Sequence, residues 1–468
     1  MNQLIAVILT LLSVIVLVYM LSKKMDIKIV LFALGLVLLY CGVFMGNKIS
    51  LLQPVANQLL QPIQVIIDQF TTTLSQAGFV ILLLAGYSSY MTCIGANNVT
   101  IGGLTSTMKG IKSVYLLVPI VFLMGNILSL VVPSAANLAI ILLATLYPVL
   151  RTAGMSRLTA AAVIATTATI IPTPLGSDNV AIAAALKMSV TQYVFSYHAL
   201  ISIPTLLLMA IVHYFWQKHE DKKDGQGLSY QAELAQYGLK DDDKQQTQVV
   251  GSKFVRFIYG LLPLLPIIIL IIDFIFNVTQ GRNLTMNVQS VTIISWIVAI
   301  IIELINKKDT KQVLNDTNTF IKGMGNAMGI VVLLIAAQTY VQGLNAVGIM
   351  TMIQKLMTNI HGAGILLPLI MVILTAIIVL LSGSGLALIF ALIPLIVPLA
   401  KSAGIEPQQL AVPLQLAGNL LRAVSPVAAV ILIVSGATHL EPGQIIRRTA
   451  VPMISGVLIM LVLSFCLL

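Results

Sequence analysis

Long apolar runs without a charged side chain constrain the fold of this chain more than any other feature. Residues 114–150 and 365–400 contain no Asp, Glu, Lys or Arg. A helix needs about 20 apolar residues to cross a bilayer. Only 9% of the residues are charged and 58% are hydrophobic, whereas soluble domains carry about 25% charged residues. The sequence therefore predicts an all-α polytopic membrane protein, because a transmembrane barrel would show short alternating segments instead.

Uninterrupted membrane-spanning helices are expected wherever one apolar run lies between two loops. The expected spans are residues 3–21, 27–45, 78–95, 192–216, 254–275, 288–306, 320–342 and 449–468. The first run lacks the basic start and the small-residue cleavage site of a secretory signal, so we interpret it as a membrane helix.

Two further stretches are each long for one helix and short for two crossings. "VVPSAAN" (131–137) interrupts residues 114–150, and "LSGSG" (381–385) interrupts residues 365–400. Pro, Gly and small polar clusters break helices. Both stretches are therefore expected to be re-entrant hairpins, each with two half-helices and a polar tip.

Two more stretches, residues 157–188 and 408–438, are predicted to cross the membrane as discontinuous helices. "IPTPLGSDN" (171–179) interrupts the first and "GNLLRAVSP" (418–426) interrupts the second. Together with the eight uninterrupted spans, these two stretches give about ten crossings.

The order of these elements indicates an internal repeat. An offset of 250 residues places Ser134 on Ser384 and "PVLRTAG" (148–154) on "PLAKSAG" (398–404). Each half has five crossings, so the second half must be inverted. Inverted repeats with broken helices are typical of secondary transporters. The predicted units are residues 1–216, a cytoplasmic linker over 217–253, and residues 254–468.

The distribution of basic residues among the loops predicts how the spans are oriented in the membrane. Of the 26 lysines and arginines, 20 fall in loops on one side of the predicted membrane. Basic residues collect in cytoplasmic loops, so both termini are expected outside. The same rule accounts for the net charge of +10 without a nucleic-acid partner.

A break in a membrane helix frees backbone N–H and C=O groups, which is tolerated only inside protein or beside a wet cavity. Half-helix N-termini favour anions, and carbonyl ends favour cations. Because four breaks occur at matched places in inverted halves, we expect their polar residues to meet near the membrane midplane. The candidate substrate ligands are Ser134, Asn137, Thr173, Ser177, Asn179, Ser382, Gly383, Ser384, Asn419, Arg422 and Ser425. Asp178 is the candidate ion-coupling residue.

Arg422 is the only charged residue between Leu410 and Thr438. A guanidinium is always charged and can hold a carboxylate through two hydrogen bonds. Arg422 and the N-termini of the hairpin helices could together hold two carboxylates of one small molecule. The alternative is structural: Arg422 and Asp178 neutralise each other, and the serines and asparagines only help helices to pack.

Other signals point to no metal, cofactor or catalytic site. The five histidines at 198, 213, 219, 361 and 439 lie near span ends or in loops and are expected at the interfaces. The three cysteines form no metal-binding or disulfide pattern. "GMGNAMG" (323–329) looks like a phosphate loop but opens a membrane helix, so helix packing is the better interpretation.

Four segments resemble the DcuC family of anaerobic C4-dicarboxylate carriers, and the resemblance extends along almost the whole chain. These are "YSSYMTCIGANN" (87–98), "LLATLYPVLRTAGMSRLTAAAV" (142–163), "HYFWQKHEDKK" (213–223) and "NLLRAVSPVAAVI" (419–431). The resemblance implies exchange, uptake or efflux of succinate, fumarate and malate across a bacterial inner membrane. It also implies coupling to Na⁺ or a proton, a homodimer and an elevator-type movement.

Two alternatives to a dicarboxylate carrier stay open. A carrier of another class, such as a cation/proton antiporter or a carrier of another organic anion, would make Asp178 central and Arg422 structural. The third possibility is a membrane enzyme or receptor. Two features speak against it: the sequence shows no catalytic constellation, and it contains the predicted inverted repeat.

Overall fold

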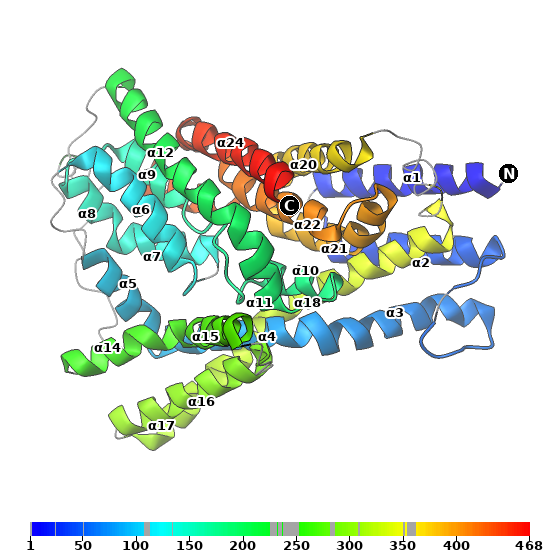
Figure 1. Cartoon of the computed structure of the whole chain (residues 1–468), viewed down its shortest axis with the longest axis horizontal. Helices are drawn as coiled ribbons and strands as arrows, with labels where there is room; N and C mark the ends of the chain where they lie inside the picture. Colours follow the sequence, from blue (N-terminus) through cyan, green and yellow to red (C-terminus); the bar gives the residue numbers. More distant parts are fainter. Residues whose placement is uncertain are drawn as a thin grey trace.

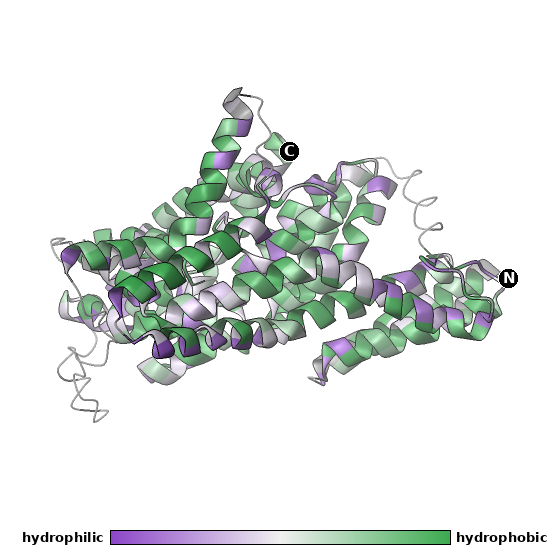
Figure 2. Ribbon diagram, turned by 90° about the horizontal axis from the view of Figure 1, so that it is seen from below, coloured by the Kyte–Doolittle hydropathy of each residue, from purple (hydrophilic) through white to green (hydrophobic). Residues whose placement is uncertain are grey.

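The computed structural model describes residues 2–23, 25–49, 51–106, 113–132, 134–224, 232, 236, 252–280, 286–307, 309–349, 352 and 362–468. This described part is helical and contains no strand, as the sequence predicts. Most helices lie along the long direction of the molecule in Figure 1. Apolar residues, green in Figure 2, make up most of the length of these helices.

The first half of the chain forms two sets of helices. The first set is α1 (Asn2–Ser22), α2 (Ile27–Phe44), α3 (Gln61–Thr73), α4 (Phe79–Cys93) and α5 (Ala96–Ser106). A π-helical turn joins α3 to α4 without a break. The second set is α6 (Val114–Leu128), α7 (Ala135–Thr145), α8 (Tyr147–Thr152), α9 (Arg157–Ala165), α10 (Ser177–Ala185), α11 (Val190–Gln192) and α12 (Ala199–Asp224).

The second half begins with helices that precede the next tip. They are α14 (Lys253–Leu261), α15 (Leu265–Gln280), α16 (Val288–Asn306), α17 (Thr310–Asp316) and α18 (Asn318–Ala346). The remaining helices are α20 (Ala363–Ser382), α21 (Gly385–Ser402), α22 (Pro407–Leu421), α23 (Ala429–Thr438) and α24 (Pro442–Leu467). The helices therefore stop at all four polar stretches that the sequence marks as breaks.

Ten helical segments in the described part are long and apolar enough to cross a membrane. The number equals the ten predicted crossings, but the segments that make up the two sets are not the same. α20 and α21 each have the length of a span, although we expected them to form one hairpin. By contrast, α9 and α10 are nine residues each and do not reach that length separately.

The predicted linker over 217–253 begins within a helix. α12 continues to Asp224, so residues 217–224, the first eight of the predicted linker, are helical. Residues 225–251 lie outside the described part apart from 232 and 236.

α18 packs along α2, α3 and α4 and organises one side of the molecule. Glycines allow its close approach to α2. A Cβ atom on Gly343 would lie 2.7 Å from the carbonyl oxygen of Gly35, and one on Gly35 would lie 2.8 Å from the amide nitrogen of Tyr340. Small residues permit such contacts between membrane helices. Within "GMGNAMG", Gly323 has the same role against α4, whereas Gly325 and Gly329 face open space.

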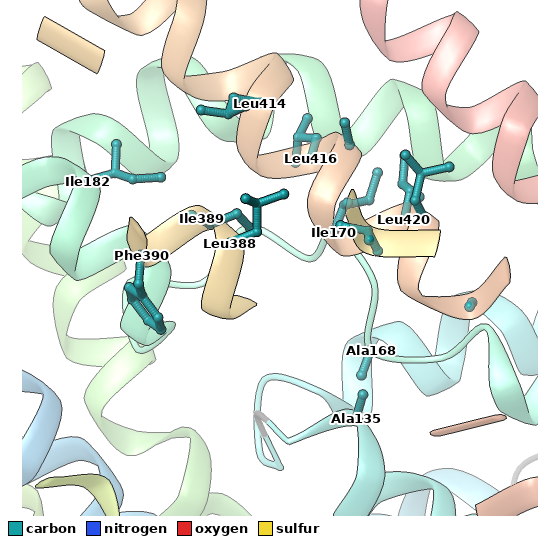
Figure 3. Close-up of a cluster of buried hydrophobic side chains, with 14 of the residues drawn as sticks. Ala135, Ala168, Ile170, Ile182, Leu388, Ile389, Phe390, Leu414, Leu416 and Leu420 are labelled. Carbon is teal, nitrogen blue, oxygen red and sulfur yellow. The ribbon is translucent and has the colours of Figure 1, made fainter. Parts of the chain in front are cut away.

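On the other side of the molecule, α12 packs against α6 and α24, and α22 packs against α20, α21 and α24. Apolar side chains from both halves meet there. Figure 3 shows Ile182 of α10 near Leu388 and Ile389 of α21, with Leu414 and Leu416 of α22 above them. All are buried. This core surrounds the interrupted segments and holds their polar residues in place.

Candidate functional site

A cavity of about 500 Å³ lies where both tips and both breaks converge. The interrupted segments contribute one wall, and α4 and α18 contribute the other. Six of the predicted ligands line the first wall: Ser134, Asn137, Ser177, Gly383, Ser384 and Arg422. Residues from all four interrupted stretches therefore border one cavity.

The two matched serines have the same structural task. Ser134 is the N-cap of α7, and its hydroxyl accepts a hydrogen bond from the amide of Asn137 at 3.4 Å. Ser384 is the N-cap of α21, and its hydroxyl accepts one from the amide of Ala387 at 3.4 Å. Serine at an N-cap satisfies one of the free N–H groups of a helix. Two helix N-termini, each with partial positive charge, therefore border the cavity.

Glycines at the second tip allow the chain to turn against the second break. Gly383 has φ +72°, a left-handed conformation that costs glycine little. A Cβ atom on Gly385 would lie 1.9 Å from the carbonyl oxygen of Gly418. The tip therefore sits directly on α22, one turn before Arg422.

Side chains replace the helical hydrogen bonds lost in the first break. The Oδ1 atom of Asn126 accepts hydrogen bonds from the amide and hydroxyl of Thr169 at 2.9 and 2.8 Å. The Nδ2 atom of Asn179 donates to the carbonyl of Thr173 at 2.8 Å. Ala168, directly before Thr169, is left-handed, with φ 56°. The non-helical backbone is thus fixed rather than loose.

Arg422 begins a short 3₁₀ turn (Arg422–Val424) at the end of α22. Its guanidinium donates to the carbonyl oxygen of Ala168 in the other break. Ser425, three residues later, donates to the carbonyl of Leu380 on α20 at 2.9 Å. These two bonds connect the second break to the first break and to the second tip.

A smaller cavity of about 60 Å³ adjoins the large one, and Ser177, Leu386 and Arg422 line both. It contains Asp178, which is 8% exposed. The other predicted residues that line it are Thr173, Asn179 and Asn419. A buried carboxylate needs partners, because leaving a charge unpaired in the interior is costly.

Asp178 does not form an ion pair with Arg422 in the described part of the chain, where each has other partners. Its Oδ2 atom accepts from Gln415 Nε2 at 2.7 Å and from Asn419 Nδ2 at 2.9 Å. Gln415 also accepts from the hydroxyl of Tyr193 at 2.6 Å. The two side chains therefore form no direct ion pair, although both line the small cavity.

Two of the predicted ligands line neither cavity. Ser382 accepts a hydrogen bond from the amide of Ser384 at 3.3 Å and is exposed on the tip. Ser425 is fully buried by its bond to Leu380. Both shape the tip and the break rather than face the cavities.

The sequence did not identify some residues in and around the two cavities as candidates. Ser88, Ser89 and Asn326 line the large cavity from α4 and α18. Gln415, a partner of Asp178, was also missed. It lies one helical turn before Asn419, and this i, i+4 spacing was the sequence signal that could have identified it. His198 was expected at an interface, but it is 1% exposed, lines the small cavity and bonds to Ser202 at 3.1 Å.

Comparison with known sequences gives a consistent picture. Residues 5–468 match the family model described as C4-dicarboxylate anaerobic carrier, DcuC. The anaerobic C4-dicarboxylate transporter DcuC of Escherichia coli strain K12 is 33% identical over 439 residues, which is 92% of this chain and 90% of that protein. The probable anaerobic C4-dicarboxylate transporter DcuC of Vibrio cholerae is 31% identical over 439 residues, covering 92% and 91%.

Solved structures share the fold at low sequence identity. Neisseria gonorrhoeae MtrF, described with a class of antimetabolite efflux pumps, aligns with a TM-score of 0.66 and 15% identity, over 96% of this chain and 97% of that one. The YdaH transporter of Alcanivorax borkumensis aligns with a TM-score of 0.59 and 15% identity, over 93% and 97%.

Proposed function

The chain belongs to the DcuC family of C4-dicarboxylate anaerobic carriers, and from this membership we propose that it is a secondary active transporter of C4-dicarboxylates. Its substrates are succinate, fumarate and malate, and it works in exchange, uptake or efflux across a bacterial inner membrane. The ten apolar helical segments and the relatives' names support a multi-pass transporter rather than an enzyme.

The position of Arg422 carries the proposal for the substrate site. It lies on the wall of a cavity of about 500 Å³, which is within the size range of small-molecule sites. Its hydrogen-bond partner is a neutral carbonyl, so no carboxylate cancels its charge directly. One carboxylate of the substrate would bind the guanidinium, which offers a planar pair of donors.

The second carboxylate would lie toward the capped N-termini of α7 and α21. Each N-terminus carries a partial charge of roughly +0.5 at short range. Ser134 and Ser384 keep these N-termini ordered at the cavity. Fixed positive potential on this wall replaces part of the hydration that a dianion loses in a low-dielectric site.

The movement and the topology are part of the same proposal. The two inverted repeats would place the tips on opposite sides of the site, and the interrupted helices would move as a unit against α2, α4 and α18. The large cavity supports this division, because the interrupted segments form one of its walls and α4 and α18 form the other. We further propose a homodimer, with Na⁺ or protons as the coupling ion and both termini in the periplasm.

Counterflow into proteoliposomes tests the substrate. Vesicles loaded with unlabelled succinate, fumarate or malate should accumulate labelled succinate, whereas vesicles loaded with a monocarboxylate such as butyrate should not. Equal accumulation with butyrate inside would argue for a carrier of other organic anions. Cation flux against a proton gradient without any exchange of diacids would argue for an antiporter.

A further inference from the structure

Three polar side chains on the α4 and α18 wall of the large cavity use none of their hydrogen-bonding groups. Ser88 and Ser89 lie on α4, and Asn326 lies on α18. None of the three side chains forms a hydrogen bond with the described residues. A hydroxyl in a helix often returns to the backbone carbonyl one turn earlier, as Thr92 does at 3.0 Å. These three groups are therefore free to bind a guest in the cavity.

The glycine-rich motif "GMGNAMG" (323–329) shapes this wall. A Cβ atom on Gly323 would lie 2.4 Å from the hydroxyl oxygen of Ser89, so glycine leaves that hydroxyl its place. Asn326 follows three residues later, and residues three apart are neighbours on one face of a helix. Both Gly323 and Asn326 line the cavity. The motif thus brings a hydroxyl and an amide to the same side of the cavity.

This wall is polar but carries no charge. Arg422 is the only charged side chain among the described residues that line the large cavity, and it belongs to the other wall. Serine hydroxyls and an asparagine amide can each donate and accept hydrogen bonds. The hydroxyl of Tyr87, on the same wall, already donates to the carbonyl of Leu262. The free groups therefore suit a neutral partner that both donates and accepts.

We propose that Ser88, Ser89 and Asn326 bind a hydroxyl group on C2 of a C4-dicarboxylate and thereby favour malate over succinate and fumarate. This inference rests on the proposed function, in which both carboxylates bind the wall formed by the interrupted segments. The C2–C3 bond of the substrate is then left to face α4 and α18. Malate carries a hydroxyl there, whereas succinate and fumarate carry only hydrogen. A site that hydrogen-bonds a substrate hydroxyl discriminates against the analogue without it, because its own polar groups stay unpaired.

The same wall should bind an ammonium group at C2 poorly. Aspartate carries this cation where malate carries the hydroxyl. Among the described residues no carboxylate lines the large cavity to pair with it. Asp178 lines the adjoining small cavity and accepts hydrogen bonds from Gln415 and Asn419 instead. A charge taken out of water without a partner is costly, so aspartate should bind more weakly than malate.

Competition during succinate counterflow measures this preference. Vesicles loaded with unlabelled succinate take up labelled succinate while malate, fumarate or aspartate is added outside, and the half-inhibiting concentrations are compared. In wild type we expect the lowest value for malate and the highest for aspartate. Asn326→Leu, and the double variant Ser88→Ala with Ser89→Ala, should each raise the malate value by about three- to tenfold, which corresponds to a lost hydrogen bond. The fumarate value and the half-saturating succinate concentration should stay near wild type.

Ser295→Ala is the matched control. Ser295 is fully buried on α16 and its hydroxyl also lacks a partner in the described part, but it lines neither cavity. This variant should keep the wild-type values. Asn326→Asp supplies the missing carboxylate and should lower the value for aspartate relative to that for malate. If the Asn326 variants do not fold, the serine variants, which remove one oxygen each, still test the proposal.

The outcomes separate this inference from the proposed function. An equal loss of affinity for malate, succinate and fumarate in the wall variants would mean that the wall binds a carboxylate, and it would overturn the inference alone. An undiminished preference for malate in those variants, or no such preference in wild type, would do the same. Absence of succinate counterflow in wild type, with no inhibition by any C4 diacid, would refute the proposed function and the inference with it.

Discussion

The guanidinium of Arg422 donates a hydrogen bond to the carbonyl oxygen of Ala168, and so joins the two interrupted helical segments. Ala168 presents this carbonyl from a left-handed backbone conformation, with φ 56°. The partner of this half-buried arginine is thus a neutral group in the other break. Asp178 has separate amide partners. No carboxylate of the described residues is hydrogen-bonded to the guanidinium, which lines the large cavity.

Removing both charges should not restore transport. If Arg422 and Asp178 were a mutually neutralising pair, the double variant Asp178→Asn with Arg422→Ala would exchange succinate nearly as wild type does. We expect no exchange in Arg422→Ala and no recovery in the double variant, because the substrate loses its cation in both. Succinate exchange and the amount of folded protein should be measured together in reconstituted vesicles.

The contact between the second tip and the second break should tolerate no side chain. Gly385→Ala places a methyl group against the carbonyl of Gly418, and overpacking of this kind costs about 1–3 kcal/mol. The control is Gly436→Ala on α23, where nothing lies within 4 Å of the added Cβ. That change should be neutral or gain about 0.5–1 kcal/mol. Unfolding midpoints in detergent compare the two, and equal midpoints would contradict the close packing.

Buried ion pairs between Arg448 on α24 and two aspartates at the end of α12 should stabilise the packing of these two helices. Arg448 has a side chain that is 1% exposed and bonds to Asp221 at 2.7 Å and Asp224 at 2.8 Å. Arg448→Ala should lower the stability by about 3–5 kcal/mol, because it removes the cationic partner of the buried Asp221 carboxylate. The neighbouring Arg447 is 49% exposed, pairs with Glu220 at 3.1 Å and also pairs with Asp224. Arg447→Ala should cost about 0–1 kcal/mol, and the ratio of the two effects in thermal unfolding is the check.

The proposed topology predicts which positions react with a membrane-impermeant thiol reagent. In a variant without Cys41, Cys93 and Cys466, Asn2→Cys should be labelled from outside intact cells. Ala235→Cys, which lies outside the described residues, should be labelled only after the membrane is opened. The reverse pattern would place both termini in the cytoplasm.

The four breaks and their convergence could be predicted because Pro, Gly and small polar residues interrupt runs that are otherwise apolar. The 250-residue offset pairs Ser134 with Ser384, and the structure gives both the same capping role. The partners of Asp178 were harder to predict. Gln415 belongs to an apolar helix in which a single amide does not signal an ion site, and only its i, i+4 relation to Asn419 marks it.

The burial of histidines and the division of helices depend on tertiary packing. His198 and His213 are 1% and 0% exposed because α11 and α12 form one continuous segment with a π-helical turn, packed against α6 and α24. No local pattern shows that packing. Likewise, the lengths of α20 and α21 suit two spans as well as one hairpin, so composition does not distinguish these arrangements.

Succinate affinity of Arg422→Lys tests the central claim most directly. Lysine keeps the positive charge and can still donate to the carbonyl of Ala168, but it lacks the planar fork that holds a carboxylate with two bonds. The half-saturating succinate concentration for counterflow should be compared with wild type in vesicles that hold equal amounts of folded protein. We predict a rise of about tenfold or more, equivalent to at least about 1.4 kcal/mol of binding free energy. A wild-type value in the folded lysine variant would contradict the assignment of Arg422 to the substrate.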